Sequence, residues 1–272
     1  MFRWVRLISF ADILTLANGL IGFIAITYIL KGDIMSLHIA TMLIFLAMLV
    51  DGLDGAVARR FGTKHSMGRH LDSISDSISF CMAPALMLYV TFYESPGGSL
   101  PVNALALSAS LLMLGFGMLR LARFTVKGFK HKNFSGIPTP AATFFVFTAC
   151  EVFGRAPPFV STEPLIILPL SIIIAFFMIL DVEYPKVRPR GKNLWIVASL
   201  VALMFLPVAL AWFVYTALYY VLIQWVVLIT FVSIVLYLLF GPLYVKVRKL
   251  GDAGDRSETA DLPISRKKSG AV

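Results

Sequence analysis

The sequence predicts an all-α integral membrane protein with about eight transmembrane helices and with both termini in the cytoplasm. Two observations predict this class. First, 58% of the 272 residues are hydrophobic and only 14% are charged, whereas soluble domains average about half apolar and a quarter charged. Second, all but two of the 24 Lys and Arg residues fall on one side of the predicted membrane, which is the bias that marks cytoplasmic segments.

Eight segments are long and apolar enough to cross a bilayer, which takes about 20 residues per helix. Only Lys31 and Arg155 lie in the predicted outside loops. The connections between spans are short, and no internal repeat is visible. The predicted spans are residues 11–30, 34–58, 72–93, 103–125, 138–154, 164–181, 193–213 and 216–244.

The two ends of the chain differ from this membrane part. Residues 1–10 have basic residues before an apolar run, as a signal peptide does, but the run is long and carries Asp12 and Asn18. We therefore expect a short interfacial segment followed by a retained first span. Residues 11–244 are predicted to form one transmembrane domain. Residues 245–272 are polar with almost no apolar periodicity, which predicts a disordered cytoplasmic tail.

The net charge of +9 mainly reflects the basic residues that set the membrane topology. Attraction of these residues to anionic lipid is a secondary effect. Nucleic-acid binding is the rival interpretation of so basic a chain. The charge is spread over loops between spans, so this interpretation is disfavoured. Cys81 and Cys150 both fall inside apolar runs, where small buried core residues are expected.

Four aspartates lie at the edges of the second and third spans, in the stretch "DGLDGAVARRFGTKHSMGRHLDSISD". Asp51 and Asp54 are three residues apart and Asp72 and Asp76 are four apart, so each pair shares a helix face. Antiparallel helices would bring all four together at the cytoplasmic edge of the bilayer. Carboxylates at that depth are costly and repel one another unless cations neutralise them. Oxygen ligands without His or Cys at ligand spacing suit Mg²⁺, Mn²⁺ or Ca²⁺ better than zinc.

Small residues and an arginine accompany these acids. Gly52, Gly55 and Ala58 clear side-chain bulk from the helix, and Arg59 offers a planar fork of donors for phosphate oxygens. Together they describe a site for a metal-bound diphosphate. The structural alternative is that the acids are helix caps or partners of surface arginines.

The pattern D-x-x-D-G-x-x-A-R-x₈-G-x₃-D-x₃-D resembles the signature of the CDP-alcohol phosphotransferase family. The resemblance implies the fold of that family, a homodimer, and transfer of a phosphatidyl-type group from a CDP-linked glycerolipid to an alcohol with release of CMP. It also implies two divalent ions, Mg²⁺ or Mn²⁺, with Asp51, Asp54 and Asp72 as metal ligands and Asp76 as a ligand that is also the general base. The transmembrane domain would then be the catalytic domain. The matching residues are Asp51, Asp54, Gly55, Ala58, Arg59, Gly68, Asp72 and Asp76, with Asp76 as ligand and base.

Further stretches resemble the members of this family that use L-serine as acceptor: "LTLANGLIGF", "LDSISDSISFCMAPAL", "RLARF" and "FSGIPTPAA". The resemblance implies that Thr15 and Asn18 face the nucleotide, although Thr and Asn also serve ordinary packing between spans. The predicted CDP-lipid-binding residues are thus Thr15, Asn18, Gly55, Ala58, Arg59 and Gly68.

Arg120 and Arg123 are one turn apart at the cytoplasmic end of the fourth span, where they could clamp the carboxylate of serine. The alternative is that they serve topology or lipid headgroups. Two rival functions stay open: the same chemistry with glycerol 3-phosphate or an inositol phosphate as acceptor, and a cation-coupled transporter. The donor lipid could be diacyl or archaeal diether, since both tails are simply apolar.

Overall fold

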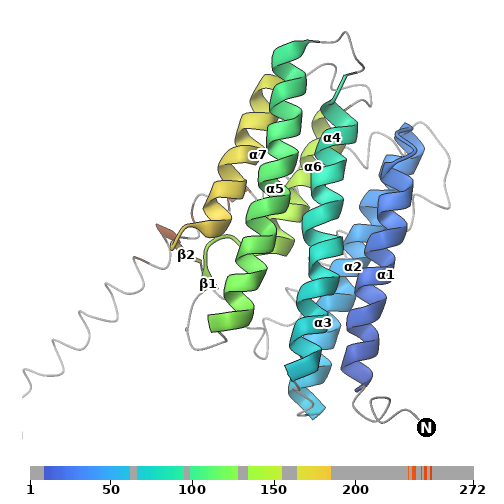
Figure 1. The fold of residues 1–272 in the computed structure, drawn as a ribbon, viewed down its shortest axis with the longest axis vertical. Helices are drawn as coiled ribbons and strands as arrows, with labels where there is room; N and C mark the ends of the chain where they lie inside the picture. The colour runs from blue at the N-terminus through green and yellow to red at the C-terminus, as the bar shows by residue number, and fades with distance from the viewer. Residues whose placement is uncertain are drawn as a thin grey trace, which may run out of the picture.

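A computed structural model of the chain describes residues 9–61, 66–94, 99–127, 134–154 and 164–184, with a few single positions between 232 and 246. Over these residues the fold is almost entirely helical, and the helices run side by side as a bundle (Figure 1). The elements are α1 (Phe10–Ile29), α2 (Ile34–Phe61), α3 (Ser66–Asp76), the π-helical segment η2 (Ser77–Met82), α4 (Ala83–Phe92), α5 (Leu100–Lys127), β1 (Phe134–Ser135), α6 (Thr139–Phe153), α7 (Pro164–Ile179) and β2 (Glu183–Tyr184).

Four stretches of helix are long and apolar enough to cross a membrane: Phe10–Ile29, Ile34–Gly55, Met67–Phe92 and Leu100–Val126. They coincide with the first four predicted spans. Helices α6 and α7 coincide with the next two but have only 15 and 16 residues, short of the roughly 20 that a bilayer requires. The predicted span 193–213 and nearly all of 216–244 lie outside the described residues, so the total of eight stays a prediction.

The third span begins earlier than the expected residue 72. Helix α3 starts at Ser66 and continues through η2 into α4 as a single rod (Figure 1). Its first residues, "SMGRH", are polar, and the span expected from the sequence therefore left them out. Gly68 and Asp72 therefore lie inside a helix, whereas the predicted span began only at Asp72 and left Gly68 in the connection before it.

The start of α1 is fixed by a capping box. The Ser9 hydroxyl accepts a hydrogen bond from the backbone N–H of Asp12 at 3.3 Å, and the Asp12 carboxylate accepts one from the backbone N–H of Ser9 at 2.8 Å. These bonds satisfy two of the amides that a helix start leaves without a partner. The interfacial segment expected at residues 1–10 lies almost wholly outside the described residues.

Glycines let α1 lie directly against α3 and η2. A Cβ at Gly19 would stand 3.0 Å from the Ser75 hydroxyl, and a Cβ at Gly22 would stand 2.8 Å from the Cα of Ser79. The Ser79 hydroxyl donates a hydrogen bond of 3.0 Å to the Asn18 carbonyl across the same contact. Small residues with a polar cross-link are the usual way in which membrane helices pack closely.

The close contact predicts that Gly22→Ala destabilises the protein. The added methyl group would overlap the η2 backbone, and overpacking of this kind costs about 1–3 kcal/mol. Gly115→Ala is the matched control, because an added Cβ there meets nothing within 4 Å. Thermal unfolding of both variants in one detergent checks the prediction. Equal midpoints for the two variants would contradict the described contact.

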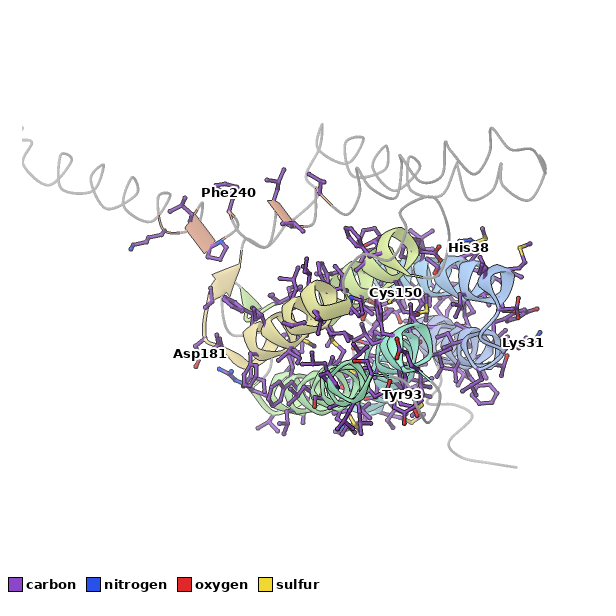
Figure 2. All side chains as sticks on the ribbon, turned by 90° about the horizontal axis from the view of Figure 1, so that it is seen from above. Lys31, His38, Tyr93, Cys150, Asp181 and Phe240 are labelled. Atoms are coloured by element: carbon purple, nitrogen blue, oxygen red, sulfur yellow. The ribbon has the colours of Figure 1, made fainter. Side chains whose placement is uncertain are left out.

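The outer surface of the bundle is apolar, as expected for a lipid-facing protein (Figure 2). Large hydrophobic side chains that face outward include Phe23 at 59% exposed, Leu111 at 59% and Phe176 at 50%. A soluble protein rarely exposes so much contiguous apolar surface. Cys81 and Cys150 are buried and unpaired, which confirms the expectation that both are core residues.

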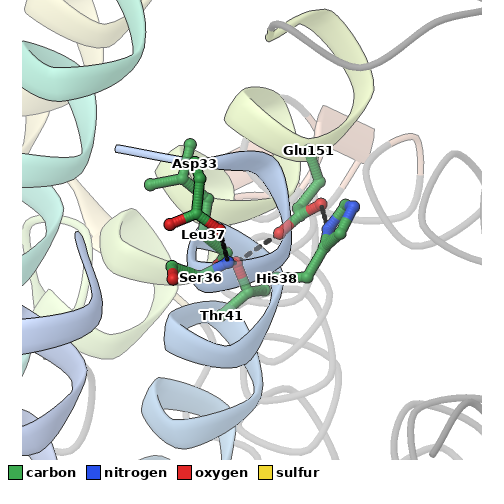
Figure 3. Close-up of polar contacts among 6 residues, drawn as sticks. All are labelled: Asp33, Ser36, Leu37, His38, Thr41 and Glu151. Atoms are coloured by element: carbon green, nitrogen blue, oxygen red, sulfur yellow. Dashed lines mark hydrogen bonds and ion pairs between the residues drawn. The ribbon is translucent and has the colours of Figure 1, made fainter. Parts of the chain in front are cut away.

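A buried polar cluster joins α2 to α6 near the start of α2 (Figure 3). His38 Nδ1 pairs with Glu151, and the Thr41 hydroxyl donates to the same carboxylate at 2.5 Å. Asp33 accepts the backbone N–H of Ser36 at 3.0 Å just before this cluster. His38 precedes Asp51 by 13 residues, or about 20 Å of helix, so the cluster lies far along α2 from the aspartates.

We expect this cluster to stabilise the bundle without taking part in catalysis. Glu151→Leu leaves His38 without its partner and should lower the unfolding midpoint, because a lost hydrogen bond to a charged group costs about 1.5–3 kcal/mol. The double variant His38→Leu/Glu151→Leu should recover most of that loss, because apolar replacements remove both polar groups at once. A double variant less stable than Glu151→Leu would contradict this account.

Candidate active site

Three aspartates from two helices converge in one group. Asp51 of α2 and Asp72 and Asp76 of α3 place carboxylate oxygens within 4.8 Å of one another. The four-residue spacing of Asp72 and Asp76 puts both on one face of α3, from which their carboxylates approach that of Asp51. Asp76 is 9% exposed, and no His or Cys belongs to the group.

The expected fourth aspartate lies next to this group rather than in it. Asp54 is 6% exposed, and its carboxylate accepts a hydrogen bond of 2.6 Å from the Thr15 hydroxyl of α1. The sequence predicted that all four carboxylates converge. Within the described residues, three meet tightly, and Asp54 lies one turn along α2 at the contact with α1.

Helix α1 supplies polar partners for these carboxylates. Thr15 bonds to Asp54, and the Asn18 side-chain N–H donates to Asp76 Oδ1 at 3.1 Å. Asn18 is fully buried, yet its own Oδ1 has no hydrogen-bond partner in the described structure. The sequence suggested that Thr15 and Asn18 face a nucleotide. The structure shows that Thr15 also bonds to Asp54 and that Asn18 also bonds to Asp76.

Charge repulsion makes the three-aspartate group unfavourable by itself. Like charges a few ångströms apart in a medium of low dielectric constant repel strongly, and burial removes the water that would screen them. The hydrogen bond from Asn18 to Asp76 offsets only part of this cost. The donor set, which consists of carboxylate oxygens, fits a hard divalent cation.

The helix next to the aspartates offers open space. Gly52 is exposed, and a Cβ added there would meet nothing within 4 Å. Gly55 follows one turn later and is half-buried. Ala58 and Arg59 continue the helical backbone of α2, but their side chains lie outside the described part of the structure. The surface of α2 at Gly52, next to Asp51, is therefore open.

Gly68 has a packing role that the sequence did not indicate. It lies in the first turn of α3, where an added Cβ would stand 2.6 Å from Asp12 Oδ1 of α1. The glycine thus allows the start of α3 to approach the capped start of α1. Its predicted contact with a CDP-linked lipid stays a prediction.

The π-helical segment η2 directly follows Asp76. Pro84 has no N–H, so an α-helical bond to the Phe80 carbonyl cannot form. Instead, the Thr143 hydroxyl of α6 donates to that carbonyl at 2.8 Å. Short π-helical turns occur frequently at functional sites. Here the turn fixes α6 against the rod that carries Asp72 and Asp76.

Arg120 of α5 is buried, at 9% exposed, and its charge interacts with that of Asp76. Its Nη1 donates to the Thr139 hydroxyl at the start of α6, 3.2 Å away. Its Nε has no partner among the described residues. A buried guanidinium with an unused donor near acids is suited to hold a further anion.

Arg123 lies one turn further along α5 but has different partners. Its Nη1 donates to the Ile179 carbonyl at 3.0 Å, and its Nη2 pairs with Asp181. Both partners belong to the end of α7 and the residues just after it. The expected clamp of two arginines on one carboxylate stays a prediction, and the described contacts of Arg123 point toward α7.

Sequence reasoning missed the polar residues of α6. Thr139 and Thr143 are 1% and 0% exposed and bond to Arg120 and to the η2 backbone. The stretch "FSGIPTPAA" was recognised only as a resemblance, without a role for its threonine. The sequence feature that could have identified this threonine is its position directly after a proline at the start of a predicted helix.

Comparison with known proteins agrees with this geometry. The sequence profile described as CDP-alcohol phosphatidyltransferase matches residues 8–180, which span α1 to α7. A CDP-diacylglycerol–serine O-phosphatidyltransferase of Methanocaldococcus jannaschii is 35% identical over 186 residues, covering 68% of this chain and 78% of that protein.

Two further relatives differ in the name of their lipid product. An archaetidylserine synthase of Methanothermobacter thermautotrophicus is 32% identical over 68% of this chain and 73% of its own. A CDP-diacylglycerol–serine O-phosphatidyltransferase of Helicobacter pylori is 30% identical over 80% of this chain and 92% of its own. The resemblance inferred from the aspartate motif is thus confirmed: the chain is an integral membrane protein of the CDP-alcohol phosphatidyltransferase family.

Proposed function

We propose that this protein synthesises a phosphatidylserine-type lipid by transferring a phosphatidyl-type group from a CDP-linked lipid to L-serine, with release of CMP. The observation that carries the proposal is the group of Asp51, Asp72 and Asp76, and the buried Arg120, whose charge interacts with that of Asp76, supports it. The names of the relatives support serine as the acceptor. They also support either CDP-diacylglycerol or CDP-archaeol as the donor.

The aspartates would hold two divalent ions, Mg²⁺ or Mn²⁺, and Ca²⁺ could occupy the same oxygen site. Asp51, Asp54, Asp72 and Asp76 are the proposed ligands. Bound there, such ions would neutralise the charge of the diphosphate and make CMP a better leaving group. The unpartnered Asn18 Oδ1 supports a cationic or polar occupant, because a buried acceptor without a donor is costly.

The donor lipid would lie along α2. The space beside Gly52 supports this placement, and Gly55 and Ala58 would let the diphosphate approach the backbone closely. Arg59 would contact phosphate oxygens. Thr15, Asn18 and Gly68 complete the proposed set, the first two through the polar face that α1 presents to the acids.

Asp76 would be the general base. A serine hydroxyl is a weak nucleophile at neutral pH, so a positioned carboxylate must accept its proton as the new bond forms. The serine oxygen would bond to the lipid-side phosphorus, the bond from that phosphorus to the CMP oxygen would break, and CMP would leave with the electron pair. The hydrogen bond from Asn18 holds one Asp76 oxygen and leaves the other for the substrate.

Arg120 would bind the carboxylate of serine. Its Nε is a buried donor without a described partner, and Thr139 holds the rest of the guanidinium in place. A single buried arginine matches a single carboxylate. Glycerol 3-phosphate or an inositol phosphate would bring more negative charge to the same pocket and would need further cations there.

The proposal includes a membrane orientation and an assembly. The site would face the cytoplasm, because the connections at that end of the predicted spans carry almost all of the Lys and Arg residues. Eight spans over residues 11–244, a polar tail at 245–272, and a homodimer surrounded by membrane lipid complete it.

An acceptor panel tests the function. Purified protein with Mg²⁺ and CDP-diacylglycerol or CDP-archaeol would be mixed with L-serine, glycerol 3-phosphate or inositol phosphate, and labelled CMP would be followed. We expect release with serine and background release with the other two. Release with glycerol 3-phosphate alone would overturn the serine assignment, and no release with any acceptor would favour a transporter.

A further inference from the structure

A short strap closes the bundle where α5, α6 and α7 meet. We define the strap as residues 134–138 together with residues 180–184. Its two strands pair antiparallel, with Phe134 opposite Tyr184 and Ser135 opposite Glu183. Figure 1 places β1 and β2 beside the end of α7 and next to α5. The strap thus connects the segment before α6 to the segment after α7.

Backbone hydrogen bonds continue this pairing toward α6. The Gly136 N–H donates to the Val182 carbonyl at 2.8 Å, and the Ile137 N–H donates to the Phe177 carbonyl at 3.1 Å. Gly136 has φ of +77°, and a Cβ there would stand 3.1 Å from the Leu180 carbonyl oxygen. Only glycine adopts this conformation at little cost and fits so close to another backbone.

Arg123 anchors the other side of the strap. The last carbonyls of a helix have no partner within the helix, and Arg123 donates to one of them, Ile179, at 3.0 Å. Its ion pair with Asp181 holds the chain one step further on, and Asp181 lies at the α7 side of the bundle in Figure 2. A cation at a helix C-terminus is also favourable electrostatically.

The strap leads directly to the arginine proposed to bind the acceptor. Ile137 is followed by Pro138 and then by Thr139, whose hydroxyl accepts from Arg120. Helix α5 therefore contacts this segment twice. Arg120 contacts the start of α6, and Arg123, one turn away, contacts the end of α7 that the strap joins to the start of α6.

We propose that Arg123 is a positioning residue, which acts through the end of α7 and the strap to hold Thr139 and thereby orient Arg120 for the acceptor. The inference rests on the proposed function, because it takes Arg120 as the acceptor-binding group. It assigns Arg123 a different role from the carboxylate clamp expected from the sequence. It also makes α7, in which the sequence showed no motif, part of the acceptor site.

Steady-state kinetics of three substitutions tests the role. Arg123→Gln and Gly136→Ala disturb the strap from opposite sides, and each should raise KM for serine about tenfold, because a small displacement of a binding group has large effects. KM for the CDP-linked lipid should stay near that of the unchanged protein. Lys31→Gln is the control, since Lys31 lies over the Tyr28 ring at the α1–α2 connection. Equal KM for serine in Arg123→Gln and the control would overturn the proposal.

A double variant separates positioning from direct contact. If Arg123 acts only through Arg120, adding Arg123→Gln to Arg120→Gln should change KM for serine less than twofold, because both changes disable one interaction. If Arg123 binds the acceptor itself, the two effects should multiply, which would overturn the proposal. Arg123→Lys keeps a charged donor near Ile179 and should raise KM for serine by less than Arg123→Gln does. It therefore replaces Arg123→Gln in both comparisons if that variant fails to fold.

A structural measurement keeps this inference distinct from the proposed function. Arg123→Gln should increase amide hydrogen exchange at Gly136 and Ile137, while exchange in α1 stays unchanged, whatever the acceptor is. Unchanged exchange at the strap would overturn the inference even in a protein that uses serine. Increased exchange in a protein whose unchanged form releases no CMP with serine would instead count against the proposed function alone.

Discussion

Asp51→Asn is expected to reduce CMP release by at least about a hundredfold at physiological Mg²⁺. The substitution removes one negative charge from the group that Asp51 forms with Asp72 and Asp76, so divalent ions should bind more weakly. Losses of 10- to 100-fold are typical even for residues one step removed from a metal. Raising the Mg²⁺ concentration should therefore restore part of the activity. CMP release measured over a range of Mg²⁺ concentrations checks this.

The matched control for this change is Asp33→Asn. Asp33 lies before the start of α2, where its carboxylate accepts the Ser36 N–H, far along the helix from Asp51. The Asp33→Asn variant should keep full activity, and its dependence on Mg²⁺ should be unchanged. Full activity in excess chelator, or an equal loss in both variants, would contradict the metal-binding role of the aspartate group.

Asp76→Asn is expected to behave differently. The substitution keeps the size of the side chain and one oxygen, but it removes the proton acceptor. If Asp76 is the general base, CDP-linked lipid should still bind while transfer to serine falls by about 10²-fold or more. Binding of the donor lipid in the presence of Mn²⁺, together with single-turnover CMP release, separates the two steps.

The response to metal distinguishes the two aspartates. High Mg²⁺ should partly restore Asp51→Asn and should leave Asp76→Asn inactive, because a cation cannot replace the lost base. An Asp76→Asn enzyme that recovers fully at high Mg²⁺ would show that Asp76 is a ligand only. Another acidic side chain of the site would then have to accept the proton.

The sequence predicted the long helices well where the hydrophobic signal is continuous. The bounds of α1, α2 and α5 agree with the expected spans within a few residues. The start of α3 was missed because its first turn is polar, and hydropathy measures only the part of a helix that lies in lipid. The π-helical turn after Asp76 was not predicted, and the hydroxyl that bonds to its Phe80 carbonyl comes from Thr143, a residue distant in sequence.

The sequence predicted which residues belong to the candidate site but not how residues of different helices contact one another there. Helical spacing was enough to place Asp72 and Asp76 on one face, because that relation is local. The position of Asp54 beside Thr15 and the bond between Asn18 and Asp76 depend on how α1 packs. The glycines that permit this packing carry no chemical signal of their own. Interhelical contacts of this kind are not encoded by spacing within a single segment.

The two arginines illustrate the same limit. Their spacing of one turn suggested a shared ligand, since side chains three residues apart lie close on a helix. In the described structure Arg120 donates to Thr139 and Arg123 donates to the Ile179 carbonyl at the end of α7, and the shared ligand stays a prediction. Both contacts lie next to the strap, which brings together segments about 50 residues apart in sequence.

We propose that this chain joins a CDP-linked lipid to serine, and the ratio of the two products tests this reaction most directly. Purified protein would be supplied with CDP-linked lipid, Mg²⁺ and isotopically labelled L-serine, and labelled lipid and CMP would be measured in the same samples. We predict that one molecule of labelled lipid forms for each molecule of CMP and that neither product forms without metal. CMP formed in the absence of serine, or without label entering lipid, would contradict the claim.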